Sequence, residues 1–341
     1  MNILFSLIYD LRNPPQWRLP FDEFYRKFLD QVAWADAHGF DSVLLSEHHF
    51  EDDGFLPSPL VLGAAIAART TKIRIAPMVT LLSLRHPVQF AEEAALVDII
   101  SGGRLDLTVG AGHHDAEFEG YGIPKRERAG RMEEALQIVK MCWEKEEFDF
   151  EGRYWQLRNV RMTPKPVQRP RPRIVLGGNS EGAAHRAARH ADGFAPSGAQ
   201  WLEPYHDELD RLGKQPGSPF PRATQPFFLH VARDPDTAWR RIAPHALYEW
   251  NEYSRYRVNN PNTSFKLIED ADWLRSNGIY TVLTPEATVA LGIERQKTDG
   301  TNAVLGFRPL SGGLPFDLAQ ESLDLVISDV MPQFLAEHHS A

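Results

Sequence analysis

The feature that most constrains the fold of this chain is an alternation between short apolar runs and longer amphipathic segments. The apolar runs have the length of buried strands, and the segments between them carry apolar residues every three or four positions, which is the period of one helix face. Neighbouring parallel strands need a crossover connection of this kind, usually a helix. The alternation therefore predicts an α/β fold built on a parallel sheet.

Eight strands of this kind can be followed along the 341 residues. Glycine and proline mark the helices between them, since Gly39 stands where a helix would end with a positive φ and Pro87 stands where a helix would begin. The expected strands are residues 3–9, 41–46, 73–79, 104–110, 173–176, 192–195, 226–231 and 302–307. Eight strand-and-helix steps predict a (β/α)8 TIM barrel, and a doubly wound open sheet is the alternative.

We predict that residues 1–341 form a single barrel domain with two excursions. Residues 147–172 predict a hairpin followed by an extended link, because prolines recur where a helix could not continue. Residues 233–301 predict a helical insertion before the last strand. Its aromatic residues include Trp239, Tyr248, Trp250, Tyr253 and Tyr256. An aromatic cover over a barrel mouth would suit an apolar substrate, so we interpret this insertion as a lid.

Composition excludes several classes of function. The longest apolar runs fall far short of the roughly 18 residues of a membrane span, and the net charge of −9 argues against a nucleic-acid partner. The single cysteine, Cys142, excludes internal disulfides, and its place in a helical pattern predicts a buried thiol. The apolar N-terminal run lacks the basic start and cleavage site of a signal peptide. We therefore expect a cytoplasmic protein that acts on a small molecule.

Polar or glycine-rich residues follow four of the expected strands. They are Glu47, His48 and His49 after the second strand, Met78, Val79 and Thr80 at the third, Gly110, Ala111, Gly112, His113, His114, Asp115 and Glu117 after the fourth, and Gly177, Gly178, Asn179 and Ser180 after the fifth. Barrel enzymes carry their catalytic groups at the carboxyl ends of strands. An imidazole can act as acid, base or hydrogen-bond donor at neutral pH, so the histidines are candidates for catalysis.

A metal site is one alternative for the two histidine pairs. Adjacent residues of a strand point to opposite faces, so the two rings of a pair cannot both enter the barrel. A metal ion would need one histidine from each pair together with a carboxylate such as Glu47 or Asp115. We therefore predict no metal ion. The other alternative is structural, with one ring of each pair packed and the other facing solvent.

Two glycine-rich turns have different interpretations. The turn from Gly177 to Ser180 opens a helix, whose free backbone N–H groups could hold a phosphate, although an ordinary turn is the alternative. Gly110 and Gly112 lack the third glycine of a dinucleotide-binding fingerprint, which weakens a Rossmann interpretation. Their missing side chains would instead clear space for a flat ligand.

Six motifs occur in a fixed order along the chain. They are Ser46 to Phe50, His86-Pro87-Val88 with Ala91-Glu92, Ser101 to Leu105, Gly110-Ala111-Gly112 with Glu117-Phe118, Pro164 to Gln168, and Gly177-Gly178. This ordered set resembles the bacterial luciferase-like flavin-dependent monooxygenases. The resemblance runs from the first strand to about Phe194 and resumes at Val330-Met331-Pro332.

The resemblance implies a (β/α)8 barrel that binds reduced FMN, usually delivered by a separate flavin reductase. Such enzymes use O2 to form a flavin hydroperoxide, a C4a-peroxyflavin, which oxygenates a small organic substrate, here apolar or aldehyde-like. We also expect a homodimer. In this resemblance His48 corresponds to the catalytic histidine near the flavin, with His49 and Glu47 as supports. The Met78–Val79 step corresponds to a non-prolyl cis peptide under the flavin ring.

The resemblance also assigns the phosphate-binding turn, to Gly177 through Ser180. Two positions depart from luciferase itself: Gly110 falls where luciferase has a reactive cysteine, and Ala111 where it has an arginine that contacts the phosphate. These departures argue against luciferase activity and leave Arg128 or Arg131 as candidate partners of the phosphate.

Two other functions remain open. A deazaflavin-dependent oxidoreductase of the same superfamily would transfer hydride without O2. Its second-strand motif more often resembles Ser-Asp-His-Phe, so Glu47, His48 and His49 favour FMN. A flavin-binding barrel that has lost its chemistry is the other possibility, and the presence of His48 and of the glycine turns argues against it.

Overall fold

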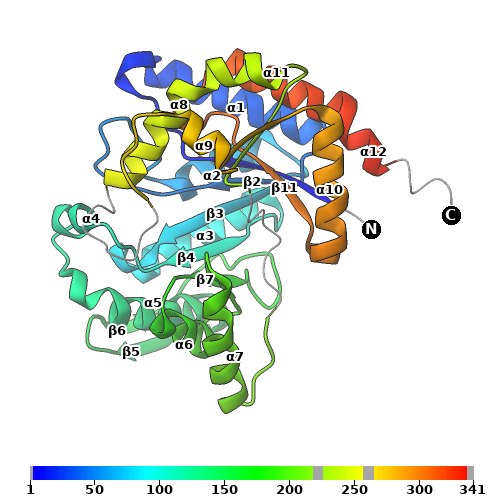
Figure 1. Cartoon of the computed structure of the whole chain (residues 1–341). Helices are drawn as coiled ribbons and strands as arrows, with labels where there is room; N and C mark the ends of the chain where they lie inside the picture. The colour runs from blue at the N-terminus through cyan, green and yellow to red at the C-terminus, as the bar shows by residue number, and fades with distance from the viewer. Residues whose placement is uncertain (1–2, 218–225, 256–264, 336–341) are drawn as a thin grey trace. The chain divides into compact units, whose positions relative to one another are not determined.

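The computed structural model describes residues 3–217, 226–255 and 265–335. Tyr256 of the expected lid lies outside these described residues. The chain forms two compact units, both visible in Figure 1. Unit 1 comprises the described residues of Met1–Val43, Glu51–Phe55 and Pro221–Ala341, and unit 2 those of Leu44–Phe50 and Leu56–Phe220.

Seven strands share one sheet, in the order β11-β1-β2-β3-β4-β7-β8. The pairs β1 with β11, β3 with β4, β4 with β7, and β7 with β8 are parallel. The sheet strands are β1 (Leu4–Tyr9), β2 (Ser42–Leu45), β3 (Arg74–Leu81), β4 (Leu107–Gly110), β7 (Ile174–Gly177), β8 (Gly193–Ala195) and β11 (Val304–Phe307). The parallel α/β class is confirmed, whereas closure into an eight-stranded barrel stays a prediction.

Two smaller strand pairs complete the described sheets. Strands β5 (Phe148–Glu151) and β6 (Gln156–Val160) form the antiparallel hairpin that the sequence predicts. Strands β9 (Phe228–Val231) and β10 (Tyr280–Leu283) form a parallel pair in unit 1. Strand β10 corrects the expectation of a purely helical insertion. Tyr280–Leu283 pair with β9, and this pairing between residues about 50 positions apart decides their conformation.

The helices follow the predicted alternation. They are α1 (Phe21–Ala37), α2 (Pro59–Arg69), α3 (Pro87–Ser101), α4 (Asp115–Gly120), α5 (Arg128–Glu144), α6 (Glu181–His190), α7 (Leu202–Arg211), α8 (Pro235–Arg255), α9 (Asp272–Ser276), α10 (Pro285–Asp299), α11 (Phe316–Leu325) and α12 (Met331–Leu335). Gly39 has the expected positive φ of 90° after α1, and Pro87 begins α3. Along the described ranges, no helix combines the length and apolar character needed to cross a membrane.

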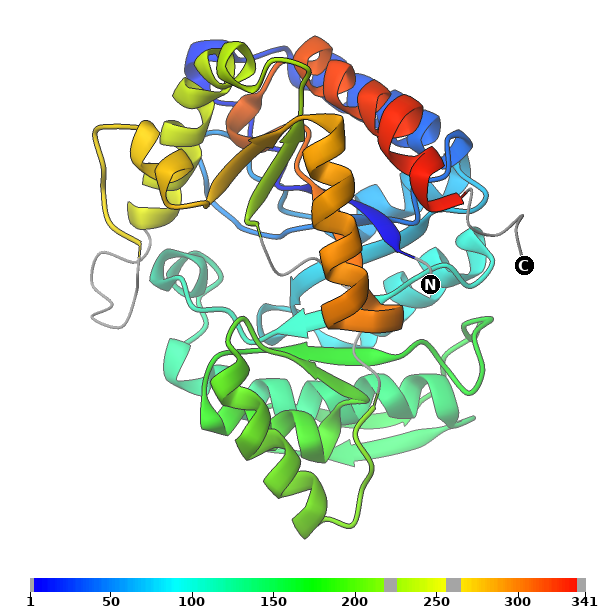
Figure 2. The same ribbon diagram turned by 45° about the vertical axis from the view of Figure 1, so that its right-hand side comes forward.

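Each unit has its own packed interior. In unit 2 the apolar face of α5 is buried, including Met132, Leu136 and Val139. Cys142 lies on the same helix and is buried, as predicted, and burial raises the pKa of its thiol to about 12. In unit 1 the rings of Phe24 from α1 and Phe316 from α11 pack edge to face, and Figure 2 shows these two helices side by side.

Candidate active site

The histidine-containing segment after β2 lies in unit 2, and its side chains are mostly buried. Glu47 and His49 are 3% and 5% exposed, and the side chain of His48 is 12% exposed. The buried strand β2 carries the chain into this polar segment, as the sequence predicts. Buried charged groups need partners, and the partners here come from α4 and the residue after it, from the end of β3, and from Arg85 beyond that strand.

Glu117 of α4 holds both histidines in place. Its Oε1 accepts a hydrogen bond from His48 Nδ1 at 2.8 Å and one from the His49 backbone N–H at 3.1 Å. Burial alone would raise the pKa of Glu117, but the hydrogen bonds and charges of the two histidines outweigh burial and lower it. Glu117 is therefore ionised at neutral pH. A carboxylate can only accept, so the Nδ1 of His48 carries a proton, and a neutral ring in this tautomer is basic at Nε2.

Glu47 is the centre of a second hydrogen-bond network. Its Oε1 accepts from His49 Nε2 and from Arg85 Nη2, both at 2.9 Å, while its Oε2 accepts from the Leu81 backbone N–H at 3.2 Å. His49 Nδ1 lies 3.1 Å from the hydroxyl of Tyr121. With Nε2 donating to Glu47, the hydroxyl of Tyr121 donates to Nδ1. His49 is thereby tied at both nitrogens, which suits a supporting role.

Two of these residues, Arg85 and Tyr121, are not among the candidates that the sequence provides. Glu117 is among the polar residues after the fourth strand, but the sequence does not pair it with His48. The signals were weak: Glu117 follows the second histidine pair, and Arg85 precedes the His86-Pro87 motif. Their partners lie 69, 38 and 72 residues away along the chain, beyond the reach of local patterns.

The Met78–Val79 peptide bond in β3 is cis, as the resemblance implies. The side chain of Val79 lies between two of the predicted cofactor-binding glycines. A Cβ added to Gly110 would be 2.9 Å from Val79 Cγ2, and one added to Gly177 would be 2.7 Å from Val79 Cγ1. The missing side chains of Gly110 and Gly177 therefore make room for Val79, and the expectation that Gly110 clears space for a flat ligand stays a prediction.

Gly112 has a similar internal role. It adopts a positive φ of 72°, and a Cβ there would lie 3.2 Å from the ring of Phe118. Ala111, between the two glycines, accepts a hydrogen bond at its backbone oxygen from Ser83 Oγ at 2.8 Å. This glycine-rich segment is thus shaped by contacts within unit 2.

The turn from Gly177 to Ser180 begins α6, as predicted. Ser180 Oγ caps the helix by accepting from the Ala183 N–H at 3.2 Å, and Asn179 Oδ1 accepts from the Ser197 N–H at 2.8 Å. A Cβ on Gly178 would meet Ala183 Cβ at 2.5 Å. These groups shape the turn, so a phosphate here would be held mainly by backbone N–H groups at the start of α6.

The two candidate phosphate cations are engaged elsewhere in unit 2. Arg128 Nη1 donates to the Lys125 backbone oxygen at 3.1 Å. Arg131 Nε donates to the Ser83 backbone oxygen at 3.0 Å, and its guanidinium lies 4.8 Å from the centre of the Trp155 ring. The structure therefore gives both cations structural contacts, and their predicted role at a phosphate stays a prediction.

The second histidine pair, His113 and His114, contacts the first pair, His48 and His49, through the ring of His113. The rings of His48 and His113 are 5.8 Å apart at 81°. Asp115 is mostly exposed and pairs with Lys125 at 2.8 Å. Among the residues described, no group of three or more His, Cys, Asp or Glu side chains is placed to hold a metal ion.

Three buried oxygen atoms in unit 2 have no hydrogen-bond partner among the described residues: Thr80 Oγ1, Thr108 Oγ1 and Glu117 Oε2. Thr80 and Thr108 are 0% and 1% exposed and stand on the neighbouring strands β3 and β4. Buried polar groups in native proteins are almost always partnered. These atoms therefore fit a ligand with hydrogen-bonding edges, such as the ring system of a flavin.

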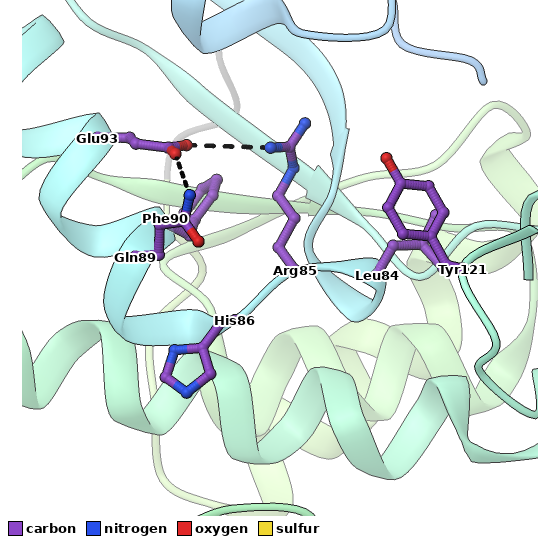
Figure 3. A pocket seen from close by; sticks show the side chains of 7 residues that line it. All are labelled: Leu84, Arg85, His86, Gln89, Phe90, Glu93 and Tyr121. Atoms are coloured by element: carbon purple, nitrogen blue, oxygen red, sulfur yellow. Dashed lines mark hydrogen bonds and ion pairs between the residues drawn. The ribbon is translucent and has the colours of Figure 1, made fainter.

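A cavity of about 210 Å³ lies near Glu47 in unit 2. It is lined by Leu84, Arg85, His86, Gln89, Phe90, Glu93 and Tyr121. Figure 3 shows the Arg85 side chain between Glu93 and Tyr121, with the His86 ring pointing away. Sites for drug-sized ligands usually have about 300–1,000 Å³. This cavity is too small for a flavin, so it is not the predicted cofactor site.

Comparison with known proteins assigns the chain to a class. The family model of the luciferase-like monooxygenases matches residues 11–278. The chain belongs to this family, whose members near this chain are oxidoreductases and monooxygenases that depend on flavin or on F420. This confirms the resemblance carried by the ordered motifs.

Among similar proteins is the oxygenase component of the flavin-dependent trigonelline monooxygenase of Acinetobacter baylyi, 29% identical over 45% of this chain and 42% of that protein. The F420-dependent glucose-6-phosphate dehydrogenase of Kineococcus radiotolerans is 32% identical over 54% of this chain and 56% of that protein. The chain matches about half the length of its curated relatives.

A solved structure shares the fold over nearly the whole chain. It is the oxygenating constituent of 3,6-diketocamphane monooxygenase from Pseudomonas putida, in complex with FMN. Its TM-score is 0.73 at 21% identity, covering 98% of this chain and 99% of that one. At this identity the likeness concerns the fold alone.

Proposed function

We propose that this chain is the oxygenase of a two-component flavin-dependent monooxygenase. It takes reduced FMN from a separate flavin reductase and uses O2 to oxygenate a small apolar or aldehyde-like organic substrate. The observation that carries the proposal is the His48–Glu117 pair, in a unit whose buried Thr80 and Thr108 hydroxyls have no hydrogen-bond partner among the described residues. Family membership and the named oxygenase relative support it.

The residues of unit 2 have separate roles in this proposal. Bound FMN supplies the redox chemistry with O2, and the protein supplies orientation and proton control. The hydroxyls of Thr80 and Thr108 hydrogen-bond the flavin ring, and the turn that begins α6 binds its phosphate. His48 exchanges a proton at Nε2, and the Glu117 carboxylate stabilises the imidazolium that results.

The second network keeps this geometry rigid. Glu47 joins His49, Arg85 and the backbone at the end of β3, so the segment that carries His48 is fixed from both sides. The residues 233–301 act as a lid that excludes water, and the hairpin within residues 147–172 belongs to the same single barrel domain. The enzyme works as a cytoplasmic homodimer.

A second candidate is an F420-dependent oxidoreductase that transfers hydride without O2. The identity to the Kineococcus enzyme favours it, because that relative uses F420. The Glu47-His48-His49 motif favours FMN instead, and on this ground we rank the monooxygenase first.

One experiment separates the candidates. The purified protein is mixed under anaerobic conditions with reduced FMN or with reduced F420, and then with O2, while absorbance is followed by stopped flow. The monooxygenase predicts tight binding of reduced FMN and a transient absorbance that differs from both free redox forms. Preferential binding of F420, with no O2-dependent transient absorbance, would refute the monooxygenase and support the F420-dependent oxidoreductase.

His48→Ala provides the matched variant. We expect it to fold and to bind FMN as the parent does but to lose most turnover, since Glu117 and the flavin contacts remain. Binding without any oxygen chemistry in the parent protein would instead indicate a flavin-binding barrel that has lost its activity.

A further inference from the structure

A second buried polar cluster lies in unit 1, where β1 and β11 end. The two strands are parallel, with Leu7 opposite Phe307, so their carboxyl ends lie side by side. Asp10 and Arg12 follow β1, and Arg308 follows β11. Helix α8 contributes Glu249 to this cluster, and the Glu249 side chain is fully buried. Charged groups from three separate segments are thus brought together in the interior of one unit.

Glu249 is held by donors from two further elements. Its Oε2 accepts hydrogen bonds from the hydroxyls of Tyr280 in β10 and of Ser311 in the loop after β11. Its Oε1 faces Arg308 Nη1 at 3.5 Å. Arg308 therefore compensates one negative charge, and α8 is joined through Glu249 to β10 and to the residues after β11.

Asp10 is 3% exposed and lies within hydrogen-bonding reach of the Glu249 carboxyl. Its Oδ1 accepts from the Arg12 backbone N–H at 3.1 Å, while Oδ2 receives no hydrogen bond from the described donors and lies 3.8 Å from Arg12 Nε. Arg12 pairs at close range with Asp53, which also accepts from Tyr248 at 2.9 Å. The charge of Arg12 is thus largely taken by Asp53.

The charges of this cluster do not balance if every carboxyl is ionised. Arg12 and Asp53 compensate each other, and Arg308 compensates one of the remaining two carboxylates. Two carboxylates that meet in a buried place cannot both keep their charge at low cost, so one of them retains a proton. An ionised carboxylate can only accept, so that proton supplies a donor between Asp10 and Glu249.

We propose that Asp10 and Glu249 form a proton-binding site, which holds one shared proton at neutral pH and so fastens α8 to the carboxyl ends of β1 and β11. The site is independent of the function proposed above. Loss of the proton leaves two like charges in contact and weakens the attachment of α8.

The titration of the site supports this reading. Burial and the neighbouring Glu249 raise the pKa of Asp10 from 3.8 to about 8, although Arg12 opposes the shift. The charged and titratable groups that face the pair are Arg12, Tyr253, Tyr280 and Arg308. Because the folded pKa is raised, the contribution to stability is complete below pH 3.8 and is lost progressively as the pH rises to about 8.

Asp10→Asn tests the proposal. The amide keeps an oxygen for the Arg12 N–H and carries a permanent N–H for Glu249, so it imitates the protonated carboxyl at every pH. We expect the folding constant of the variant, relative to that of the parent, to rise by up to about tenfold per pH unit between about pH 4 and about pH 8, and to level off above that. Chemical denaturation across this range measures it.

Asp236→Asn is the matched control. Asp236 lies on the same helix, but it is exposed and pairs with Arg275. This control should follow the parent at every pH. If Asp10→Asn also follows the parent, the shared proton does not exist and the proposal fails.

A measurement on the parent protein covers the case in which Asp10→Asn does not fold. Infrared spectra are recorded for protein with carbon-13 in the side-chain carboxyls of Asp or of Glu. We expect a protonated-carboxyl band at neutral pH that shifts with one of these labels and disappears with a midpoint near pH 8. Absence of such a band at neutral pH overturns the proposal.

Discussion

The role of Glu117 can be tested by removing its charge while keeping its shape. In Glu117→Gln the side chain retains an oxygen that can accept hydrogen bonds from His48 Nδ1 and from the His49 N–H. In the parent protein these two bonds measure 2.8 Å and 3.1 Å. Hydrogen bonds to charged groups contribute about 1.5–3 kcal/mol, against about 0.5–1.5 kcal/mol for neutral ones. The variant therefore stabilises the positively charged His48 ring, which has a proton on both nitrogens, by about 1–1.5 kcal/mol less than the parent does.

This loss converts into two measurable changes. Since 1.36 kcal/mol corresponds to a factor of ten in rate, a step that passes through protonated His48 should slow about tenfold. The same energy should displace the pH-rate profile to lower pH by about one unit. A merely structural role for Glu117 would not move the pH profile.

The assay is the stopped-flow reaction of O2 with reduced flavin bound to the protein, recorded over the pH range in which the parent is stable. Glu119→Gln is the control, because Glu119 is exposed on the same helix α4. Circular dichroism and flavin titration check that both variants fold and bind. A Glu117→Gln protein whose rate and pH profile equal those of the parent would refute the assignment of Glu117 as the residue that positions His48.

Two further predictions concern stability. Gly110→Ala should lower the free energy of unfolding by about 1–3 kcal/mol, because the new Cβ would lie 2.9 Å from Val79 Cγ2. Gly182→Ala in α6 is the control: its Cβ would point into open space, so the free energy of unfolding should rise by about 0.5–1 kcal/mol. Denaturation curves with the same midpoint for the two variants would contradict this prediction. Arg85→Gln should cost about 3–5 kcal/mol because it leaves the buried Glu47 without its cation, and a loss below 1 kcal/mol in the same assay would speak against a buried ion pair.

Part of the candidate site could be predicted from the chain alone. The polar segment Glu47-His48-His49 directly follows a buried strand, and parallel strands present their carboxyl ends at one edge of a sheet. That argument finds the place without any contact being known. It does not find Arg85, and it does not pair Glu117 with His48, because a hydrogen bond between residues 38 or 69 positions apart leaves no local pattern.

The glycines after β4 and before α6 also show what the sequence alone leaves undecided. Their presence after β4 and in the turn before α6 was evident in the sequence, and a flat ligand was a reasonable explanation for the space at Gly110. The structure shows that the side chain of Val79 lies beside Gly110, a neighbour that the sequence does not indicate. A missing side chain predicts a close approach, but only the packed fold shows which atoms approach.

The sequence by itself determined the parallel α/β class, most element boundaries and the family, since these depend on hydrophobic period, on glycine and proline positions, and on the order of short motifs. The tertiary structure alone decided the partners: Glu117 for His48, Arg85 for Glu47, β9 for β10, and Glu249 for Asp10. The reason is physical. Period and backbone preference act between residues a few positions apart, whereas burial, charge pairing and shared protons depend on distances that exist only once the strands and helices have packed.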